Sequence, residues 1–218
     1  MPISRDDRSF VQSLDRGLAV LNAFDAEHPR LTLREAAEAT GISRPAVRRL
    51  LLTLEALGYL AGDGSSYELT SRVLSLGYGF LASRSIHEVA QGFLEKLSAS
   101  IGESSSLSML DETDVVFVAR VPTHRIMNYM LSVGARLPAY VSAHGRVLLA
   151  ALSAEALDRY FQRAELLRFN SRTRTSEPQL RAELDTVRTQ GWAMIDQEFE
   201  ANVRSIAAPV RDAAGIVV

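Results

Sequence analysis

The chain has 218 residues, a formal net charge of −2 and no cysteine. This length suits one or two domains, and 47% hydrophobic residues supply enough material for a packed core. Because the charge is close to neutral, we expect no broadly basic surface, and binding of nucleic acid would depend on a local cluster. The absence of cysteine excludes disulfides, thiolate metal sites and cysteine nucleophiles.

The sequence shows no feature of a membrane protein or a secreted protein. No apolar run approaches the length of a spanning helix, and the first residues are polar. The lack of cysteine weakly favours a reducing compartment. We therefore expect a cytoplasmic location and no membrane partner.

Motifs for catalysis or metal binding are also absent. The four histidines are scattered, and the chain has no Walker loop, nucleophile elbow or HExxH zinc motif. No nucleophile can be paired with a base. The sequence therefore predicts no metal, no cofactor and no catalytic residue, and it gives little support to an enzyme.

The first predicted element is a helix over residues 10–26, where apolar residues recur at helical spacing after a polar start. Arg16 lies on this helix and can contact phosphate. A surface salt bridge is an equally good interpretation of that arginine.

Residues 31–58 predict two helices joined by a tight turn. Thr32 and Glu35 have the spacing of a capping box, which predicts a helix start, and Gly41 supplies the left-handed position that ends this helix. Ser43 is placed to cap a second helix. The apolar residues of that helix recur every three to four positions and stop at Gly58.

The second helix of this pair has a cationic face. At 100° per residue, its arginines and its proline point away from the apolar side, and no acidic residue lies between Glu38 and Glu55. A guanidinium group can bind guanine or a phosphate in a bidentate way, so the N-terminal end of the helix suits the major groove. The alternative is an ordinary amphipathic helix with a solvated arginine face.

Two short strand patterns follow and predict a hairpin. Residues 59–61 and 66–69 flank Asp63-Gly64, which is a hairpin turn signal. A helix-turn-helix followed by such a hairpin is a winged helix-turn-helix, and we assign it to residues 10–69. The predicted DNA contacts are Arg16, Thr32, Ser43, Arg44, Pro45, Arg48, Arg49 and Ser65.

Residues 70–84 predict a linker helix, and the pattern then changes to a second domain over residues 85–218. A helix is predicted at 86–101, before strands at 104–110, 115–121 and 126–133. Gly134 and Pro138 bound a loop. Helices at 141–152, 154–163 and 177–190 follow, then strands at 192–197, 205–211 and 216–218. We expect Ser176 and Gln179 to cap the helix at 177–190, and we expect 168–174 to form a solvated loop. The whole chain is predicted to be α+β, with helices on the faces of an antiparallel sheet.

The strand at 126–133 suggests a ligand pocket. It presents Asn128, Met130 and Ser132 on one face, and Gly134 and Arg136 follow. A mostly apolar lining with a few polar anchors suits a small organic anion. Backbone N–H groups at the glycine turn, an arginine, and hydroxyl groups at positions 142 or 205 can balance a carboxylate.

Each candidate in this pocket has a simpler alternative. Arg136 can be solvated, and His144 can merely cap the helix that follows it. Methionines such as Met109, Met127 and Met130 are more often core residues than ligand contacts.

Several stretches of the chain resemble one family of bacterial transcription factors. They are residues 13–18 (SLDRGL), the helix-turn-helix, 67–70 (YELT), Gly134-x3-Pro138-x6-Gly145 with 148–150 (LLA), and 204–209 (RSIAAP). On these motifs the chain resembles the isocitrate lyase regulator (IclR) family over nearly its whole length. Residues 118–123, 125–127, 132–134 and 136–140 are similar to the branch that regulates protocatechuate, 4-hydroxybenzoate and β-ketoadipate catabolism.

The resemblance implies a winged-helix domain, a linker helix and a C-terminal GAF-like effector domain, assembled as a homodimer or a dimer of dimers. It carries effector-binding positions onto Gly134, Ala135, Val203 and Ser205. His144 stands where many members of the branch have methionine. Because the family usually continues a few dozen residues past Val218, we expect the pocket to lack one wall in this chain.

These observations together predict a sequence-specific DNA-binding transcriptional regulator controlled by a small carboxylate, either an aromatic acid or its ring-cleavage product. Its predicted partners are a double-stranded DNA operator, this organic acid and a second copy of the chain. The predicted effector contacts are Met109, Asn128, Met130, Gly134, Ala135, Arg136, His144, Val203 and Ser205. Two alternatives remain: an architectural DNA-binding protein without an effector, and an enzyme whose winged helix docks another protein.

Overall fold

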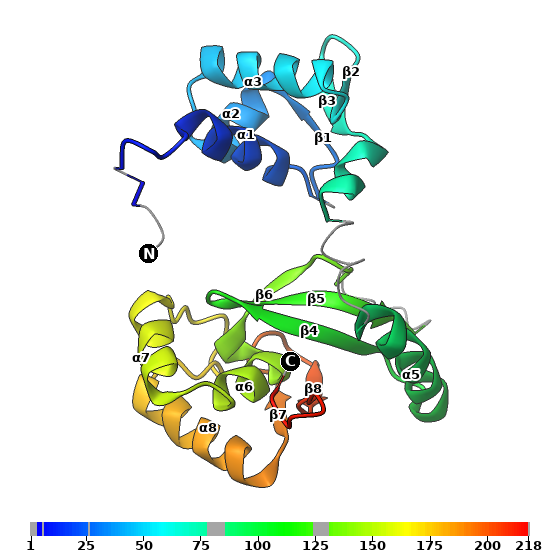
Figure 1. The fold of residues 1–218 in the computed structure, drawn as a ribbon, viewed down its shortest axis with the longest axis vertical. Coiled ribbons are helices and arrows are strands. Elements are labelled where there is room, and N and C mark those ends of the chain that lie inside the picture. The colour runs from blue at the N-terminus through cyan, green and yellow to red at the C-terminus, as the bar shows by residue number, and fades with distance from the viewer. Residues whose placement is uncertain (1–3, 6, 26, 78–85, 124–130, 218) are drawn as a thin grey trace. The chain divides into compact units, whose positions relative to one another are not determined.

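The computed structural model describes residues 4–5, 7–25, 27–77, 86–123 and 131–217. The chain forms two compact units, residues 1–84 and 85–218 (Figure 1). No helix in the described ranges is long and apolar enough to cross a membrane.

The first unit packs three helices against a small sheet. Its elements are α1 (Gln12–Asn22), β1 (Arg30–Thr32), α2 (Leu33–Thr40), α3 (Arg44–Ala56), β2 (Leu60–Gly62) and β3 (Ser66–Leu69). The strands are antiparallel in the order β1-β3-β2. The buried core of this unit comprises Val20, Phe24, Leu31, Ala36, Ala37, Val47, Leu51, Leu54 and Leu60.

The helix-turn-helix begins at the predicted capping box. The Thr32 N–H donates to Glu35 Oε2 at 2.8 Å, and the Glu35 N–H donates to Thr32 Oγ1 at 3.3 Å. Gly41 ends α2 with a φ of 67°. Ser43 occupies the N-cap of α3, but its side chain makes no capping hydrogen bond. Pro45 in the first turn has a φ already suited to the helix, which is why α3 can start without that bond.

Two features of the first unit differ from the sequence prediction. α1 spans only Gln12–Asn22, so the predicted helix over 10–26 is too long. The structure also has a third strand, β1, which pairs with β3 through Leu31 opposite Tyr67. A strand of three residues shows no usable hydrophobic period, so pairing with β3 is what forms it.

Only the start of the predicted linker helix lies in the described residues. The Thr70 side chain caps a 3-10 turn, η1 (Ser71–Val73), and residues 74–77 are helical. Residues 78–84 of the prediction fall outside the described ranges.

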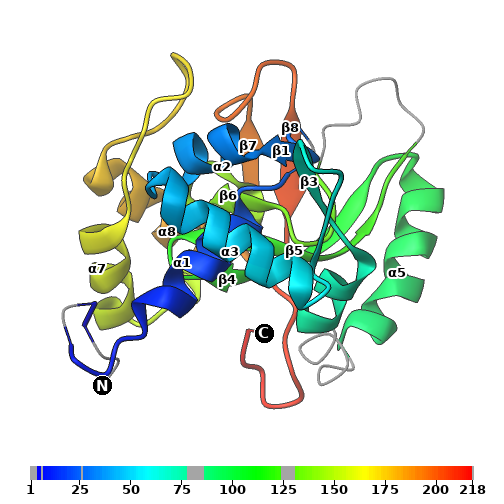
Figure 2. The same ribbon diagram turned by 90° about the horizontal axis from the view of Figure 1, so that it is seen from above.

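The second unit contains two antiparallel sheets and four helices in its described residues. In chain order they are α5 (Ile86–Ile101), β4 (Ser105–Asp111), β5 (Asp114–Val121), β6 (Arg136–Pro138), η2 (Ala139–Val141), α6 (Ala143–Ala150), α7 (Ala154–Arg163), α8 (Glu177–Gln190), β7 (Ala193–Asp196) and β8 (Arg204–Ala207). One sheet has the order β4-β5-β6, and the other pairs β7 with β8. Figure 1 shows α6, α7 and α8 together on one side of this unit and α5 on the other, and Figure 2 shows α7 and α8 again on the side opposite α5.

The two sides of the β4-β5 pair bury different clusters. Val115 and Phe117 pack with residues of α6, α7 and α8. Leu107 and Val118 instead pack with Ala90 and Leu94 of α5. The sheet therefore has helices on both faces, and the face toward α6 carries the larger core.

Several predicted elements of this unit need correction. Helices α5, α7 and α8 have the predicted bounds, but Ser176 makes no side-chain capping bond. Residues 131–135 form no strand, while β6 lies at Arg136–Pro138, where we expected a loop. Pairing of Arg136 with Val116 creates this strand. The predicted strand at 205–211 ends at residue 207, and 216–217 contribute only one bridge, Arg211 with Val217.

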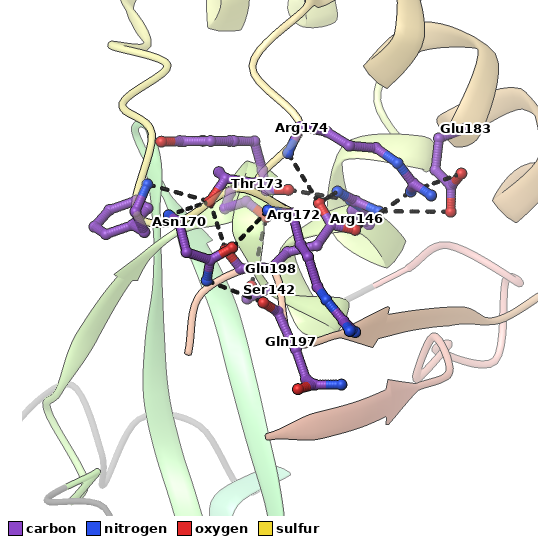
Figure 3. A network of polar contacts seen from close by, with 12 residues as sticks. Ser142, Arg146, Asn170, Arg172, Thr173, Arg174, Glu183, Gln197 and Glu198 are labelled. Atoms are coloured by element: carbon purple, nitrogen blue, oxygen red, sulfur yellow. Dashed lines mark hydrogen bonds and ion pairs between the residues drawn. The ribbon is translucent and has the colours of Figure 1, made fainter. Parts of the chain in front are cut away.

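Residues 168–174 form a loop that is mostly exposed to solvent, as expected, but two of its residues, Thr173 and Arg174, join a buried ion-pair network (Figure 3). Arg146 of α6 is 0% exposed, and its Nη2 lies 2.6 Å from Glu198 Oε2. Thr173 Oγ1 donates to the Glu198 backbone oxygen at 2.7 Å, and Arg174 Nη1 lies 3.3 Å from Glu198 Oε1. Glu183 of α8 bonds to Arg174 as well, at 3.0 Å. The loop is thereby fixed to α6, α8 and the turn after β7.

Candidate DNA-binding surface and effector site

The exposed side of α3 carries three arginines. Its other side is buried through Val47 and Leu51. Arg44, Arg48 and Arg49 are exposed, and among the described residues no hydrogen bond or ion pair engages their guanidinium groups. Since these donors are not used inside the fold, they are available to phosphates or to base edges.

Of the other predicted DNA contacts, Ser43, Pro45, Arg16 and Ser65 are exposed. Pro45 and Ser43 lie at the start of α3, and Arg16 lies on α1. The Thr32 hydroxyl is used by the capping box, where it also donates to Glu35 Oε2 at 2.9 Å. Thr32 therefore orients α2 and presents no free hydroxyl group.

Ser65 shapes the tip of the wing. Its N–H and its hydroxyl both donate to Asp63 Oδ1, at 2.9 and 2.8 Å. These bonds and the backbone bond from Ser66, which is the largest contribution, hold the pKa of the Asp63 carboxyl well below its usual range. Arg30 of β1 donates to Asp63 Oδ2 at 2.5 Å and so balances the acid at the wing tip.

In the second unit, an irregularity in strand pairing creates the candidate effector site. Ser106 is opposite Arg120 and Ser108 is opposite Phe117, with a register shift between Leu107 and Ser108. Ser106 and Ser108 are two residues apart and share a face, so their partners share it too. The bulge therefore brings Arg120 to the same face as Phe117.

This face is completed by His144 at the start of α6. The Phe117 and His144 rings meet edge to face, with centroids 5.2 Å apart. Burial lowers the pKa of His144; a hydrogen bond to the Ser106 backbone opposes this effect, and the charge of Arg120 adds to it. At neutral pH the imidazole is therefore uncharged.

Arg120 is the cation of this site. It is half-buried, and burial lowers the pKa of its guanidinium group. Across the described ranges, no carboxylate or hydrogen-bond acceptor pairs with it. A half-buried cation without a partner is costly unless an anion neutralises it. With two rings and two serines on the same face, the arrangement can bind a carboxylate attached to a flat apolar body.

The glycine turn predicted to supply backbone donors does lie beside this face, but its N–H groups are used. The Gly134 N–H donates to the Phe117 oxygen at 2.8 Å, and the Ala135 N–H donates to the Ser132 oxygen at 3.0 Å. The Ala135 oxygen accepts from the Phe117 N–H at 3.0 Å. Gly134 and Ala135 therefore position Phe117 and offer no free backbone donor.

Arg136 is not placed as an anion anchor. Its Nη1 lies 2.6 Å from Asp111 Oδ2, and its Nε lies 3.2 Å from Asp114 Oδ2. Arg136 pairs with Val116 on β5, next to Phe117 in sequence and thus on the opposite face. Two carboxylates already neutralise this arginine, so Arg120 is a better candidate than Arg136 for the predicted anchor.

The remaining predicted contacts are distributed around the unit. Met109 packs with the cluster that faces α5, away from His144. Ser205 of β8 is opposite the buried Ile195 and lies on the side that packs toward α6, whereas Val203 lies in the turn before β8, where its N–H donates to Glu200. Asn128 and Met130 lie outside the described residues.

Ser142, another proposed hydroxyl donor, is occupied as the cap of α6. Its Oγ accepts from the Gly145 N–H at 2.9 Å. Metal binding is also without support in the described ranges, where no group of three potential ligands is close enough to hold an ion. Sequence reasoning missed Ser106, Ser108, Phe117 and Arg120. The one available signal was a single basic residue in the apolar stretch DVVFVARV.

Comparisons with known proteins agree with this architecture. The IclR helix-turn-helix domain model matches residues 13–64, and the bacterial transcriptional regulator IclR C-terminal model matches residues 78–218. The Pca regulon regulatory protein of Pseudomonas putida is 42% identical over 97% of this chain and 73% of its own length.

Two solved structures are also similar. A transcriptional regulator from Rhodococcus sp. RHA1 is 50% identical, with a TM-score of 0.80 over 95% of this chain and 83% of that chain. A double mutant of the inducer-binding domain of the PobR transcription factor from Acinetobacter, in complex with 3-hydroxybenzoic acid, is 35% identical. Its TM-score is 0.57 over 61% of this chain and 78% of that chain. The chain is similar to regulators of the protocatechuate and 4-hydroxybenzoate branch. It therefore belongs to the IclR family of DNA-binding transcriptional regulators.

Proposed function

We propose that this regulator controls genes for the degradation of an aromatic acid, and that the acid or its ring-cleavage product is the effector. The recognition element is α3, and the effector's carboxylate pairs with Arg120. Because its operator is chromosomal DNA, the protein works in the bacterial cytoplasm.

The DNA-binding part of the proposal rests on the exposed arginine face of α3. One recognition helix makes too few base contacts to select a site in a genome, so two copies must bind together. We therefore propose a homodimer or a dimer of dimers, with half-sites separated by one helical turn of DNA or a multiple of it. Arg48 and Arg49 lie on the exposed side of α3, within the two turns after its N-terminus, and they are the proposed base or phosphate contacts.

The effector part of the proposal rests on Arg120, a half-buried cation without a partner in the described residues. The rings of Phe117 and His144 suit one face or edge of an aromatic ring. A neutral imidazole has one acceptor nitrogen, so a hydroxyl group on the effector is compatible with His144. The relative that binds 3-hydroxybenzoic acid supports the same ligand class.

Calorimetric titration with 3-hydroxybenzoate and benzoate tests the effector site. We expect the wild type to bind at least one of these acids and Arg120→Met to bind it ten- to a hundred-fold more weakly. Arg136→Met is the matched control, because that arginine is already paired with two aspartates, and it should bind as the wild type does. Equal affinity of wild type and Arg120→Met, or loss of binding in Arg136→Met alone, would contradict the proposal.

A further inference from the structure

The outer face of α3 holds one large apolar side chain beside its arginines. Leu52 is 41% exposed, whereas Val47, Leu51 and Leu54 of the same helix are at most 8% exposed. At 3.6 residues per turn, Leu52 points about 100–160° away from each of these three buried residues. The core of the first unit therefore does not account for a leucine at this position.

Leu52 completes a regular row with residues proposed to contact DNA. Pro45, Arg48, Arg49 and Leu52 are spaced i, i+3, i+4 and i+7, and all four are exposed. The homeodomain recognition helix reads the major groove with four residues of this same spacing. At 1.5 Å per residue the row spans about 10 Å, which is close to three base-pair steps of about 3.4 Å. Leu52 is therefore within reach of a base that neighbours those beside Arg48 and Arg49.

We propose that Leu52 contacts the C5-methyl group of a thymine in each half-site and determines specificity at that base pair. This inference rests on the proposed function, in which α3 enters the major groove. An arginine binds guanine O6 and N7, whereas an alkyl side chain can read only an apolar group, and the thymine methyl is the apolar group of the major groove. Arginines beside a leucine thus favour a half-site with guanine and thymine within the same few base pairs.

The surroundings of Leu52 favour a base edge over the phosphate backbone. Leucine has no hydrogen-bond donor for a phosphate oxygen. The acidic residue of α3, Glu55, accepts a hydrogen bond from the Gly62 N–H of β2 at 3.1 Å. The Thr53 hydroxyl donates to the Arg49 backbone oxygen at 2.7 Å, so its proton is used within the helix. Leu52 is therefore the side chain with which this turn of α3 can contact a base.

Deoxyuridine tests this contact, because it pairs as thymidine does and lacks only the C5-methyl group. Each thymine of an operator fragment selected from random DNA is replaced in turn, and fluorescence anisotropy at a fixed salt concentration measures the affinity of the full chain. At one thymine of each half-site, we expect the wild type to bind about four-fold more weakly without the methyl group, as the loss of one buried methyl contact implies. Leu52→Ala should bind the unmodified operator more weakly and show no further loss at that thymine.

Leu57→Ala is the matched control. Leu57 is 51% exposed and forms the C-cap of the same helix, but it lies outside the row. This variant should respond to deoxyuridine as the wild type does. Leucine and alanine have similar helix propensities, so both variants should melt close to the wild-type temperature, which shows that they are folded.

The outcomes separate this inference from the proposed function. A wild type that is insensitive to every methyl group, a methyl effect that persists in Leu52→Ala, or its loss in both leucine variants would overturn the contact at Leu52. Weaker binding by Arg48→Ala in the same assay would still support α3 as the recognition helix. Wild-type binding by both Arg48→Ala and Arg49→Ala would instead reject the groove assignment, and the contact at Leu52 with it.

Discussion

Arg120 and Phe117 face the same side of β5 although they are three positions apart, because the register shift between Leu107 and Ser108 reverses the alternation of the strand. In a regular strand Arg120 would face α5, and the cation would be separated from His144. The candidate effector site therefore depends on one irregularity in the pairing of β4 with β5.

The arginines of α3 should determine affinity for DNA. We expect Arg48→Ala and Arg49→Ala each to weaken binding to a selected operator fragment. Where the replaced arginine contacts a base, the variant should lose about 1–3 kcal/mol of binding free energy and discriminate less at one base position. Arg163→Ala is the control, since this residue lies on α7 and pairs with Glu112 at 2.9 Å. Fluorescence anisotropy at a fixed salt concentration measures the effect. Unchanged binding in both α3 variants would rule out the proposed groove contact.

The buried Arg146–Glu198 pair should be essential for stability. Glu198→Gln leaves the guanidinium group buried with its main counter-charge removed, and we expect a loss of about 3–5 kcal/mol in the free energy of unfolding. Glu112→Gln, which breaks the exposed pair with Arg163, should cost under about 1 kcal/mol. Urea denaturation followed by circular dichroism compares the two. A similar loss of unfolding free energy in both variants would show that the buried ion pair stabilises the fold no more than the exposed pair does.

Gly145 should tolerate no side chain. A Cβ atom at this position would lie 2.1 Å from the Ala139 backbone oxygen, so Gly145→Ala must move either α6 or the turn before it. We expect severe destabilisation, visible as a large drop in melting temperature or as insoluble protein. Gly92→Ala is a suitable comparison, because Gly92 also lies in a helix and no atom lies within 4 Å of the corresponding Cβ. That variant should melt at or above the wild-type temperature.

Neutral His144 should make the fold sensitive to mild acid. Burial lowers the pKa of His144 below its ordinary value of 6.5, so the unfolded chain takes up the proton more readily than the folded chain. The contribution of His144 to stability is therefore complete above pH 6.5 and decreases as the pH falls below it. Melting temperatures of wild type and His144→Met from pH 8 to pH 5 give the difference. A gap between the two curves that does not change with pH would contradict the assigned charge state.

The sequence predicts helices well where local chemistry sets their limits. The capping box at Thr32 and the left-handed glycines at positions 41 and 191 set helix ends through local interactions, so these ends can be read from the sequence without knowledge of the tertiary contacts. The short strands β1 and β6 were not predictable, because each has three residues and exists only by pairing with β3 or β5.

The candidate effector site could likewise be predicted only in part, because it depends on pairing between strands. Arg120 could be recognised as the only charged residue of an apolar strand interior, but its face depends on the register between β4 and β5. Arg136 has the same chemistry and lies in a family motif, and only the positions of Asp111 and Asp114 show that its charge is already balanced. Residue type indicates which side chains can bind an anion, whereas pairing in space determines which of them is free.

The bond from Arg30 to Asp63 has a mechanical consequence. It fastens β1, which directly precedes α2, to the tip of the wing, and Arg30 Nε also donates to Ser66 Oγ at 3.2 Å. These bonds hold the helix-turn-helix and the wing together as one rigid winged-helix domain. In the proposed homodimer, the effector would therefore alter DNA binding by changing the distance or angle between two winged-helix domains, while each domain keeps its own shape.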